Sequence, residues 1–246
     1  MATDIQYALM AGRVYQSTRG KINWFPDLQS LGWTEFFPQQ EPSGLEAISF
    51  QKGNEVVISF AGTGSNVDWW ANFGGLFGVT SVQLMQAADY YLRVKAANPG
   101  ATISLTGHSM GGGLASLTAV FFGETATTFD QAPFRNSASI AAAYNLMSYL
   151  SEPARGYNTL ALTQALTQAL QGLANFANAA ASGGIPNESN VRDFSVPGEV
   201  LSVASGLRIG TPANPPSLTH GAYFGPKDLH AQALLSNQKG QRRILF

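Results

Sequence analysis

The chain of 246 residues contains no cysteine, which excludes disulfide bonds, cysteine-ligated metal sites and a thiol nucleophile. It is also poor in charge, because Asp, Glu, Lys and Arg together make up 12% of its residues and the formal net charge is −1. That balance gives no reason to expect nucleic acid or an anionic membrane as a partner. The sequence also lacks any uninterrupted apolar run of about 18 residues, so it predicts no transmembrane segment.

The first residues, Met1 to Ile5, contain no basic segment followed by an apolar run, which indicates that no secretory signal peptide is present. We therefore expect a chain that is cytoplasmic, exported by a non-classical route, or cut from a larger protein. Its length predicts a single domain over residues 1–246, of α/β type.

Strand-like and helix-like apolar patterns alternate along the chain. The patterns predict helices over Asp4–Gln16, Ser81–Ala97 and Leu114–Phe122, and strands over Leu45–Gln51, Glu55–Phe60, Ala101–Leu105, Thr125–Phe129 and Val191–Val196. The segment Gly20–Pro42 is rich in Trp, Phe, Pro and Gly and predicts a surface loop. Alternation of this kind favours a mostly parallel central sheet with helices on both faces.

An Ala-rich segment at about residues 136–182 predicts a helical insertion. Its leucines form a narrow apolar stripe of Leu162, Leu166, Leu170 and Leu173. Two interpretations of the stripe stay open. The stripe either packs the insertion onto the domain, or belongs to a cap that opens over the functional site to admit an apolar substrate.

The run Thr106–Gly113 (T-G-H-S-M-G-G-G) lies between a strand pattern and a helix pattern. A G-x-S-x-G motif in that context predicts a nucleophile elbow, in which a strained serine stands on a sharp strand-to-helix turn. Side chains at Gly107 or Gly111 would collide with the neighbouring strand or helix. Ser109 is therefore the predicted nucleophile.

A serine hydroxyl needs a general base within hydrogen-bond reach, and the chain offers only three histidines. His108 adjoins Ser109, and we expect its side chain to pack beneath the turn. His230 lies near the start of a predicted short helix, in the position where hydrolases of this architecture commonly place the base. His220 lies in a Pro- and Gly-rich loop that could also reach the site, so His230 is favoured and His220 is the alternative.

The base in turn needs an acid, expected between nucleophile and base in the sequence. Glu199 follows the predicted strand at its C-terminal edge and is the favoured acid. Asp193 is the alternative, although its place inside the strand favours an ion pair with the neighbouring Arg192. Oxyanion donors are expected from the backbone N–H of Met110 and from Thr63, in the loop after Glu55–Phe60.

These stretches resemble the class 3 lipase family and related α/β-hydrolases. The resemblance is strong over V-V-I-S-F-A-G-T-G-S-N-V-D-W-W-A-N-F and I-S-L-T-G-H-S-M-G-G-G-L-A-S-L-T-A, weaker over V-P-G-E-V-L-S and weakest at Leu229-His230. It implies an α/β-hydrolase fold with Ser109 as nucleophile and Thr63 as an oxyanion residue. The chain departs from the family at Ala61, where arginine is usual, at Glu199, where aspartate is usual, and in the position of its insertion.

The resemblance implies a serine carboxylic-ester hydrolase of lipase or phospholipase type that needs no cofactor and no metal. We expect a lipid or small ester as substrate and transient contact with a lipid interface. The apolar segment Phe73–Val79, with Leu76 and Phe77, is interpreted as part of an acyl-binding mouth or as a buried connector. Two alternatives stay open: hydrolysis of a thioester or amide, and a non-catalytic α/β-hydrolase-like binding module.

Overall fold

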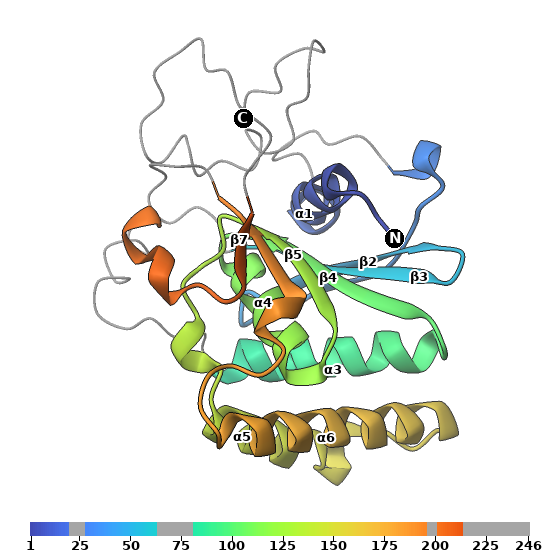
Figure 1. Cartoon of the computed structure of the whole chain (residues 1–246). Helices are drawn as coiled ribbons and strands as arrows, with labels where there is room; N and C mark the ends of the chain where they lie inside the picture. The colour runs from blue at the N-terminus through green and yellow to red at the C-terminus, as the bar shows by residue number, and fades with distance from the viewer. Residues whose placement is uncertain (20–27, 63–80, 196–200, 214–246) are drawn as a thin grey trace.

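The computed structural model describes residues 1–19, 28–62, 81–195 and 201–213, and a seven-stranded sheet forms their centre (Figure 1). The strands follow one another in chain order: β1 (Thr34–Gln40), β2 (Glu46–Lys52), β3 (Glu55–Phe60), β4 (Thr102–His108), β5 (Thr125–Phe129), β6 (Val191–Phe194) and β7 (Thr211–Ala213). Pairing is antiparallel from β1 to β3 and parallel from β3 to β7. The mostly parallel sheet confirms the predicted α/β-hydrolase class.

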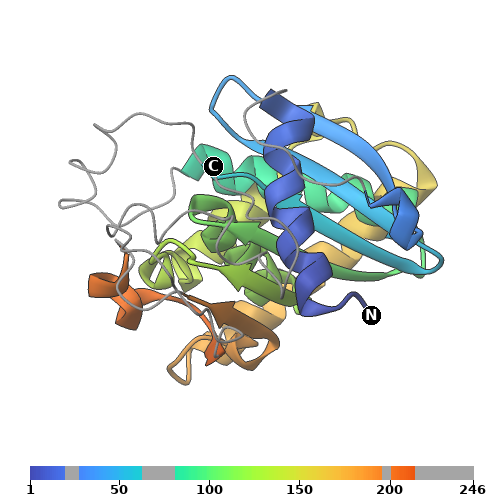
Figure 2. The same ribbon diagram turned by 90° about the horizontal axis from the view of Figure 1, so that it is seen from above.

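Helices cover both faces of this sheet (Figures 1 and 2). One face is covered by α1 (Asp4–Arg19), and the other by α3 (Ser81–Ala97) and α4 (Met110–Phe122). Outside α3 and α4 lie α5 (Ile140–Leu150) and α6 (Leu160–Ala180). None of the described helices has the length and apolar character needed to cross a bilayer. Short 3-10 turns complete the described chain: η1 (Gln29–Leu31), η2 (Arg135–Ser137), η3 (Pro153–Arg155), η4 (Glu188–Asn190) and η5 (Ser202–Leu207).

The prediction of a loop over Gly20–Pro42 is wrong for the second half of that segment, because β1 pairs there with β2. The register shifts between Phe36 and Gln39, and Phe37 adopts a left-handed conformation with φ 52°. This bulge accommodates Pro38, whose missing N–H a β-ladder tolerates only at an edge or a bulge.

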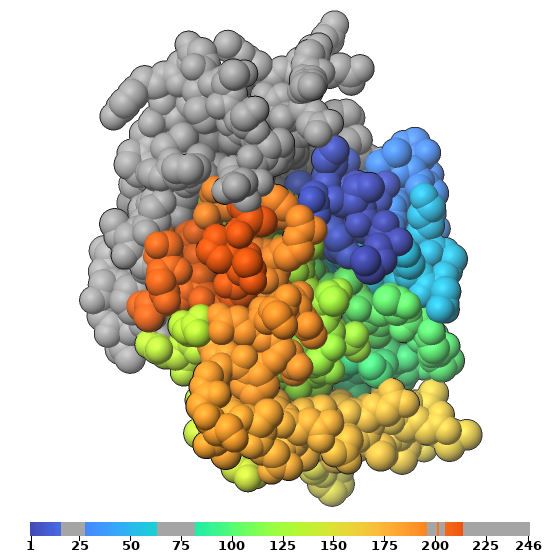
Figure 3. Space-filling model, in the orientation of Figure 1, coloured from blue at the N-terminus to red at the C-terminus, as the bar shows by residue number. Residues whose placement is uncertain are grey.

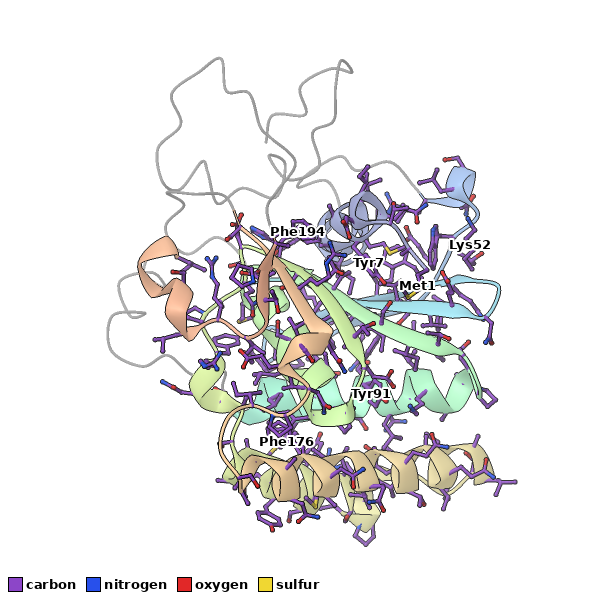
Figure 4. All side chains as sticks on the ribbon, in the orientation of Figure 1. Met1, Tyr7, Lys52, Tyr91, Phe176 and Phe194 are labelled. Atoms are coloured by element: carbon purple, nitrogen blue, oxygen red, sulfur yellow. The ribbon has the colours of Figure 1, made fainter. Side chains whose placement is uncertain are left out.

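Successive residues of each strand face opposite sides of the sheet, as the two-residue period of a strand requires. In β4, Ile103 and Leu105 join the apolar core shared with α3 and α4. Ser104 and Thr106 instead face α1, where their hydroxyls meet the Tyr7 hydroxyl at 2.9 Å and the Tyr7 carbonyl oxygen at 3.3 Å. Figure 4 shows Tyr7 between α1 and the sheet.

The predicted insertion is helical, and α6 begins at the N-cap Thr159, whose side chain accepts the N–H of Leu162. Its buried face packs toward α3, α4 and α5, and the Phe176 ring meets the Phe121 ring of α4 edge-on at 4.6 Å. Leu173 is fully buried in this contact. In Figure 3, α5 and α6 form the surface at the lower end of the molecule. That the segment acts as a cap stays a prediction.

Candidate active site

Ser109 occupies the sharp turn between β4 and α4, with φ 57° and ψ −126°. L-residues rarely adopt this conformation, so the surrounding structure must hold it in place. Backbone hydrogen bonds do so on both sides: the Ser109 N–H donates to the Phe129 carbonyl at 3.1 Å, and the Ser109 carbonyl accepts the N–H of Ala132 at 2.8 Å. The predicted strained turn is therefore confirmed.

The glycines around Ser109 make this turn possible. A Cβ on Gly111 would lie 2.1 Å from the Phe60 carbonyl oxygen of β3, and one on Gly107 would lie 2.4 Å from the backbone of Gly111. Both contacts are with backbone atoms, which cannot swing aside as a side chain would. Any other residue at these positions would push α4 away from the sheet, as the motif predicts.

The helix that follows Ser109 starts at Met110, so its first N–H groups carry the partial positive charge of a helix N-terminus. Ser109 is the N-cap of α4, yet its hydroxyl caps none of the described N–H groups of that helix. Ser109 as a whole residue is 7% exposed. The local geometry thus leaves the hydroxyl to a role other than capping, beside donors suited to an oxyanion.

The loop after β3 begins beside this turn. Its first residues, Ala61 and Gly62, are buried, and a Cβ on Gly62 would lie 3.2 Å from the Ser109 Cβ. Thr63, the predicted oxyanion residue, follows directly but lies outside the described residues. The position of Gly62 agrees with the predicted role of this loop and leaves that of Thr63 a prediction.

His108 is buried, with its ring turned toward α1, where its Nδ1 lies 3.3 Å from the Tyr15 hydroxyl. This agrees with the expectation that His108 packs beneath the turn. The two other histidines, His220 and His230, lie outside the described residues, as does the favoured acid Glu199. Their roles stay predictions.

Asp193 is buried inside β6, but its predicted ion pair with Arg192 is wrong. Neighbouring residues of a strand point to opposite faces, so Asp193 faces α4 while Arg192 faces α1. Asp193 pairs with the buried Arg208 at 3.4 Å, and Arg192 pairs with Asp4 at 2.8 Å. Burial raises the pKa of Asp193 from 3.8 to about 6, and Arg208 and hydrogen bonds from Gln131 and Thr128 oppose that shift.

Gln131 connects this carboxylate to the nucleophile helix. Its Nε2 donates to the Thr128 hydroxyl at 3.2 Å, and that hydroxyl donates to Asp193 at 3.2 Å. On the other side, the Ser116 hydroxyl of α4 donates to the Gln131 Oε1 at 2.9 Å. The side chain of Asp193 is therefore part of a buried structural network between β5, β6 and α4.

Asp130 is a further carboxyl group at the end of the sheet where Ser109 lies, and no motif of the sequence points to it. It is fully buried directly after β5, with φ 43°, and its N–H donates to the Phe194 carbonyl at 2.8 Å. Asp130 lies in the sequence between Phe129 and Ala132, whose backbone groups bond to Ser109. An acidic residue immediately after a predicted strand is the signal that would have identified it.

The described residues contain no group of three or more His, Cys, Asp or Glu side chains arranged to hold a metal ion. The arrangement of Ser109 is instead suited to nucleophilic chemistry, because a strained serine adjoins helix N–H donors and a glycine loop.

Residues 6–212 match the family model of the Tle-like phospholipase domain. The chain is also similar to the extracellular phospholipase A1 of Serratia liquefaciens, with 38% identity over 90 residues. That alignment covers 37% of this chain and only 28% of the relative.

Two solved lipases have weakly similar structures. A fungal lipase matches with a TM-score of 0.48 at 14% identity, over 92% of this chain and 82% of its own. The propeptide complex of Rhizomucor miehei lipase matches with a TM-score of 0.46 at 13% identity, over 86% of this chain and 67% of its own. The assignment to a family depends on the match over residues 6–212.

Proposed function

The chain belongs to the Tle-like phospholipase domain family, and we propose that it is a serine hydrolase that cleaves carboxylic esters of lipids, phospholipids above all. The observation that carries this proposal is the strained turn at Ser109, which lies inside the matched residues 6–212. The similarity to a phospholipase A1 supports the same substrate class, although it covers a minor part of that relative.

In the proposed reaction the Ser109 hydroxyl attacks the ester carbonyl carbon while His230 accepts its proton. Negative charge collects on the carbonyl oxygen, where the N–H groups of Met110 and Thr63 donate to it. The ester C–O bond then breaks, and the leaving alcohol takes the proton from His230. Water repeats these steps on the acyl-enzyme, which releases the fatty acid and restores Ser109.

Glu199 is the proposed partner of the imidazole, and two other carboxyl groups compete with it. Asp193 is less suited because it faces α4 and is engaged with Arg208 and Thr128. Asp130 is the stronger competitor, since it lies at the edge of the sheet beside the turn. Glu199→Gln, Asp130→Asn and Asp193→Asn separate the three, because loss of the triad acid lowers kcat by about 10⁴-fold.

The decisive test is fluorophosphonate labelling together with release of fatty acid from phosphatidylcholine vesicles. The parent is expected to be labelled and active, whereas Ser109→Ala is expected to lose both. Ser182→Ala is the matched control, because Ser182 is an exposed loop residue. His230→Ala and His220→Ala, assayed beside them, identify the base. A labelled and active Ser109→Ala variant contradicts the proposal.

Substrate class is tested on matched ester, thioester and amide compounds of several acyl lengths. We expect the ester to react fastest, and a faster thioester or amide would reassign the reaction. Leu76→Ala and Phe77→Ala test the proposed acyl-binding mouth. A preference for acyl length that stays the same in both variants contradicts that part of the proposal.

A further inference from the structure

Tyr15 reaches from α1 to the point where β3 and β4 end. Its hydroxyl oxygen accepts the N–H of Gly62 at 2.7 Å and lies 3.3 Å from the His108 Nδ1. Phe60 and Gly107 are register partners in the two strands, so Gly62, two residues after β3, and His108, the last residue of β4, lie at neighbouring strand ends. One phenol oxygen therefore contacts both the loop after β3 and the residue before Ser109.

Gly62 fits this contact because it has no side chain. A Cβ there would lie 2.6 Å from the Tyr15 hydroxyl and 3.1 Å from the His108 carbonyl oxygen. The same atom would lie 3.2 Å from the Ser109 Cβ. Gly62 thus lies between the phenol and the nucleophile with no room for a methyl group.

The bond to Tyr15 also determines which N–H of the loop can serve the reaction. The N–H of Gly62 points to the phenol oxygen, so it is not directed at an oxyanion in front of Ser109. An oxyanion donor from this loop would then belong to a residue after Gly62, and the proposed donor Thr63 is the first such residue. Small displacements of such donors are costly, because their benefit depends on fixed geometry.

We infer that Tyr15 is a positioning residue, which sets the distance between the oxyanion loop and Ser109 by holding Gly62 and His108 with one hydroxyl. This inference rests on the proposed hydrolase function. It assigns Tyr15 no contact with the substrate. It predicts that the hydroxyl acts on the transition state, where charge develops on the carbonyl oxygen, more than on substrate binding.

Tyr15→Phe removes the hydroxyl and keeps the ring. Tyr7→Phe is the matched control, since Tyr7 is a second phenol on α1 whose hydroxyl bonds to Ser104, inside β4. We expect Tyr15→Phe to lower kcat by about 10- to 100-fold with KM within about 3-fold. Binding of a trifluoromethyl ketone analogue of the ester should weaken in proportion to kcat/KM. Tyr7→Phe should keep the kcat of the parent.

Gly62→Ala supplies a second variant that acts on the same contact from the other side. Its methyl group presses on the Tyr15 hydroxyl, so we expect a lower kcat that the double variant with Tyr15→Phe partly restores. If the role of Tyr15 is only structural, Tyr15→Phe and Gly62→Ala should each lower the melting temperature. Their separate effects on kcat should then add up in the double variant.

The possible results separate the inference from the function on which it rests. A parent that neither hydrolyses esters nor reacts with a fluorophosphonate overturns both. An active parent whose kcat is unchanged in Tyr15→Phe, or lowered equally in Tyr7→Phe, overturns only the positioning role. Selective loss in Tyr15→Phe with weaker binding of the ketone supports it.

Discussion

The two faces of the sheet hold the nucleophile turn by different means. On the face of α3 and α4, β4 contributes Ile103 and Leu105 to an apolar core, and the glycines of α4 bring that helix against the backbone of β3. On the face of α1, β4 presents Ser104 and Thr106, and phenol groups of the helix meet hydroxyls and loop N–H groups. Both faces are packed, since α1 has an apolar cluster of its own with Met10 and Val14. Beside the turn, however, one face depends on close contact between backbone atoms, and the other on individual hydrogen bonds.

The difference determines how each face responds to a change. Close-packed backbone cannot accept added atoms, because interiors are packed to crystal-like density. A hydrogen-bonded contact tolerates small changes of shape but loses its effect when a single polar atom is removed. The site at Ser109 depends on both kinds of contact, because Ser109 follows the end of β4, where α4 lies on one face of the sheet and α1 on the other.

The largest expected effect comes from adding one carbon to the packed face. In Gly111→Ala the new methyl group would lie 2.1 Å from the Phe60 carbonyl oxygen, so α4 or β3 must move. We expect a loss of at least about 3 kcal/mol in the free energy of unfolding and no detectable fluorophosphonate labelling. Thermal unfolding, monitored by circular dichroism, measures the loss of unfolding free energy.

Gly206→Ala is the control for that variant, because a Cβ at Gly206 meets nothing within 4 Å. It should leave labelling and melting temperature close to those of the parent. Labelling of Gly111→Ala at the rate of the parent would show that the contact between α4 and β3 is not what fixes the turn.

Local motifs made the packed side of the site predictable from the sequence. Gly107, Ser109 and Gly111 lie within five residues of one another, so their spacing already states the geometry that the structure confirms. The strand Thr125–Phe129 and the helix Ser81–Ala97 also have the predicted bounds. In each case neighbours along the chain determine the structure.

Contacts between distant segments were not predictable in this way. The hydroxyl of Tyr15 acquires its role only when α1 packs across the ends of β3 and β4, and Arg208 reaches Asp193 only once β6 is buried. Strand β1 was missed because Pro38 and Phe37 favour a loop until β2 pairs with them. The pairing of Asp193 with Arg192 was an avoidable error, since the period of a strand places neighbours on opposite faces.

Asp193 and Arg192 therefore provide a direct comparison of the two faces. Because burial raises the pKa of Asp193 to about 6 in the folded chain, folding favours its protonated form. The resulting contribution to the free energy of unfolding is fully present below about pH 4. It is lost as pH rises through about 6, and its size is up to about 3 kcal/mol. The Asn variant lacks this titration.

We expect the difference in unfolding free energy between the parent and Asp193→Asn to change across this window, in the sense that the parent loses more stability from pH 4 to pH 7. Urea titrations at four pH values over that range measure it. Parallel profiles for the two proteins would mean that Asp193 titrates alike in the folded and unfolded chains.

The smallest effect is expected on the other face, at the ion pair of Arg192 with Asp4. Both side chains are about half exposed, at 51% and 47%, so water and salt screen their attraction. Asp4→Asn should cost less than about 1 kcal/mol, and the cost should shrink further in about 1 M NaCl. Urea titration at low and high salt measures both values.

A larger, salt-independent cost in Asp4→Asn would change the comparison of the two faces. It would mean that the pair anchors the start of α1 to β6 as firmly as packing anchors α4. The position of Tyr15, on the same helix, would then depend on a charge at its other end, and kcat should fall together with stability in Asp4→Asn. With a weak pair, kcat should stay at the value of the parent, because the buried apolar residues of α1, among them Met10 and Val14, hold the helix by packing.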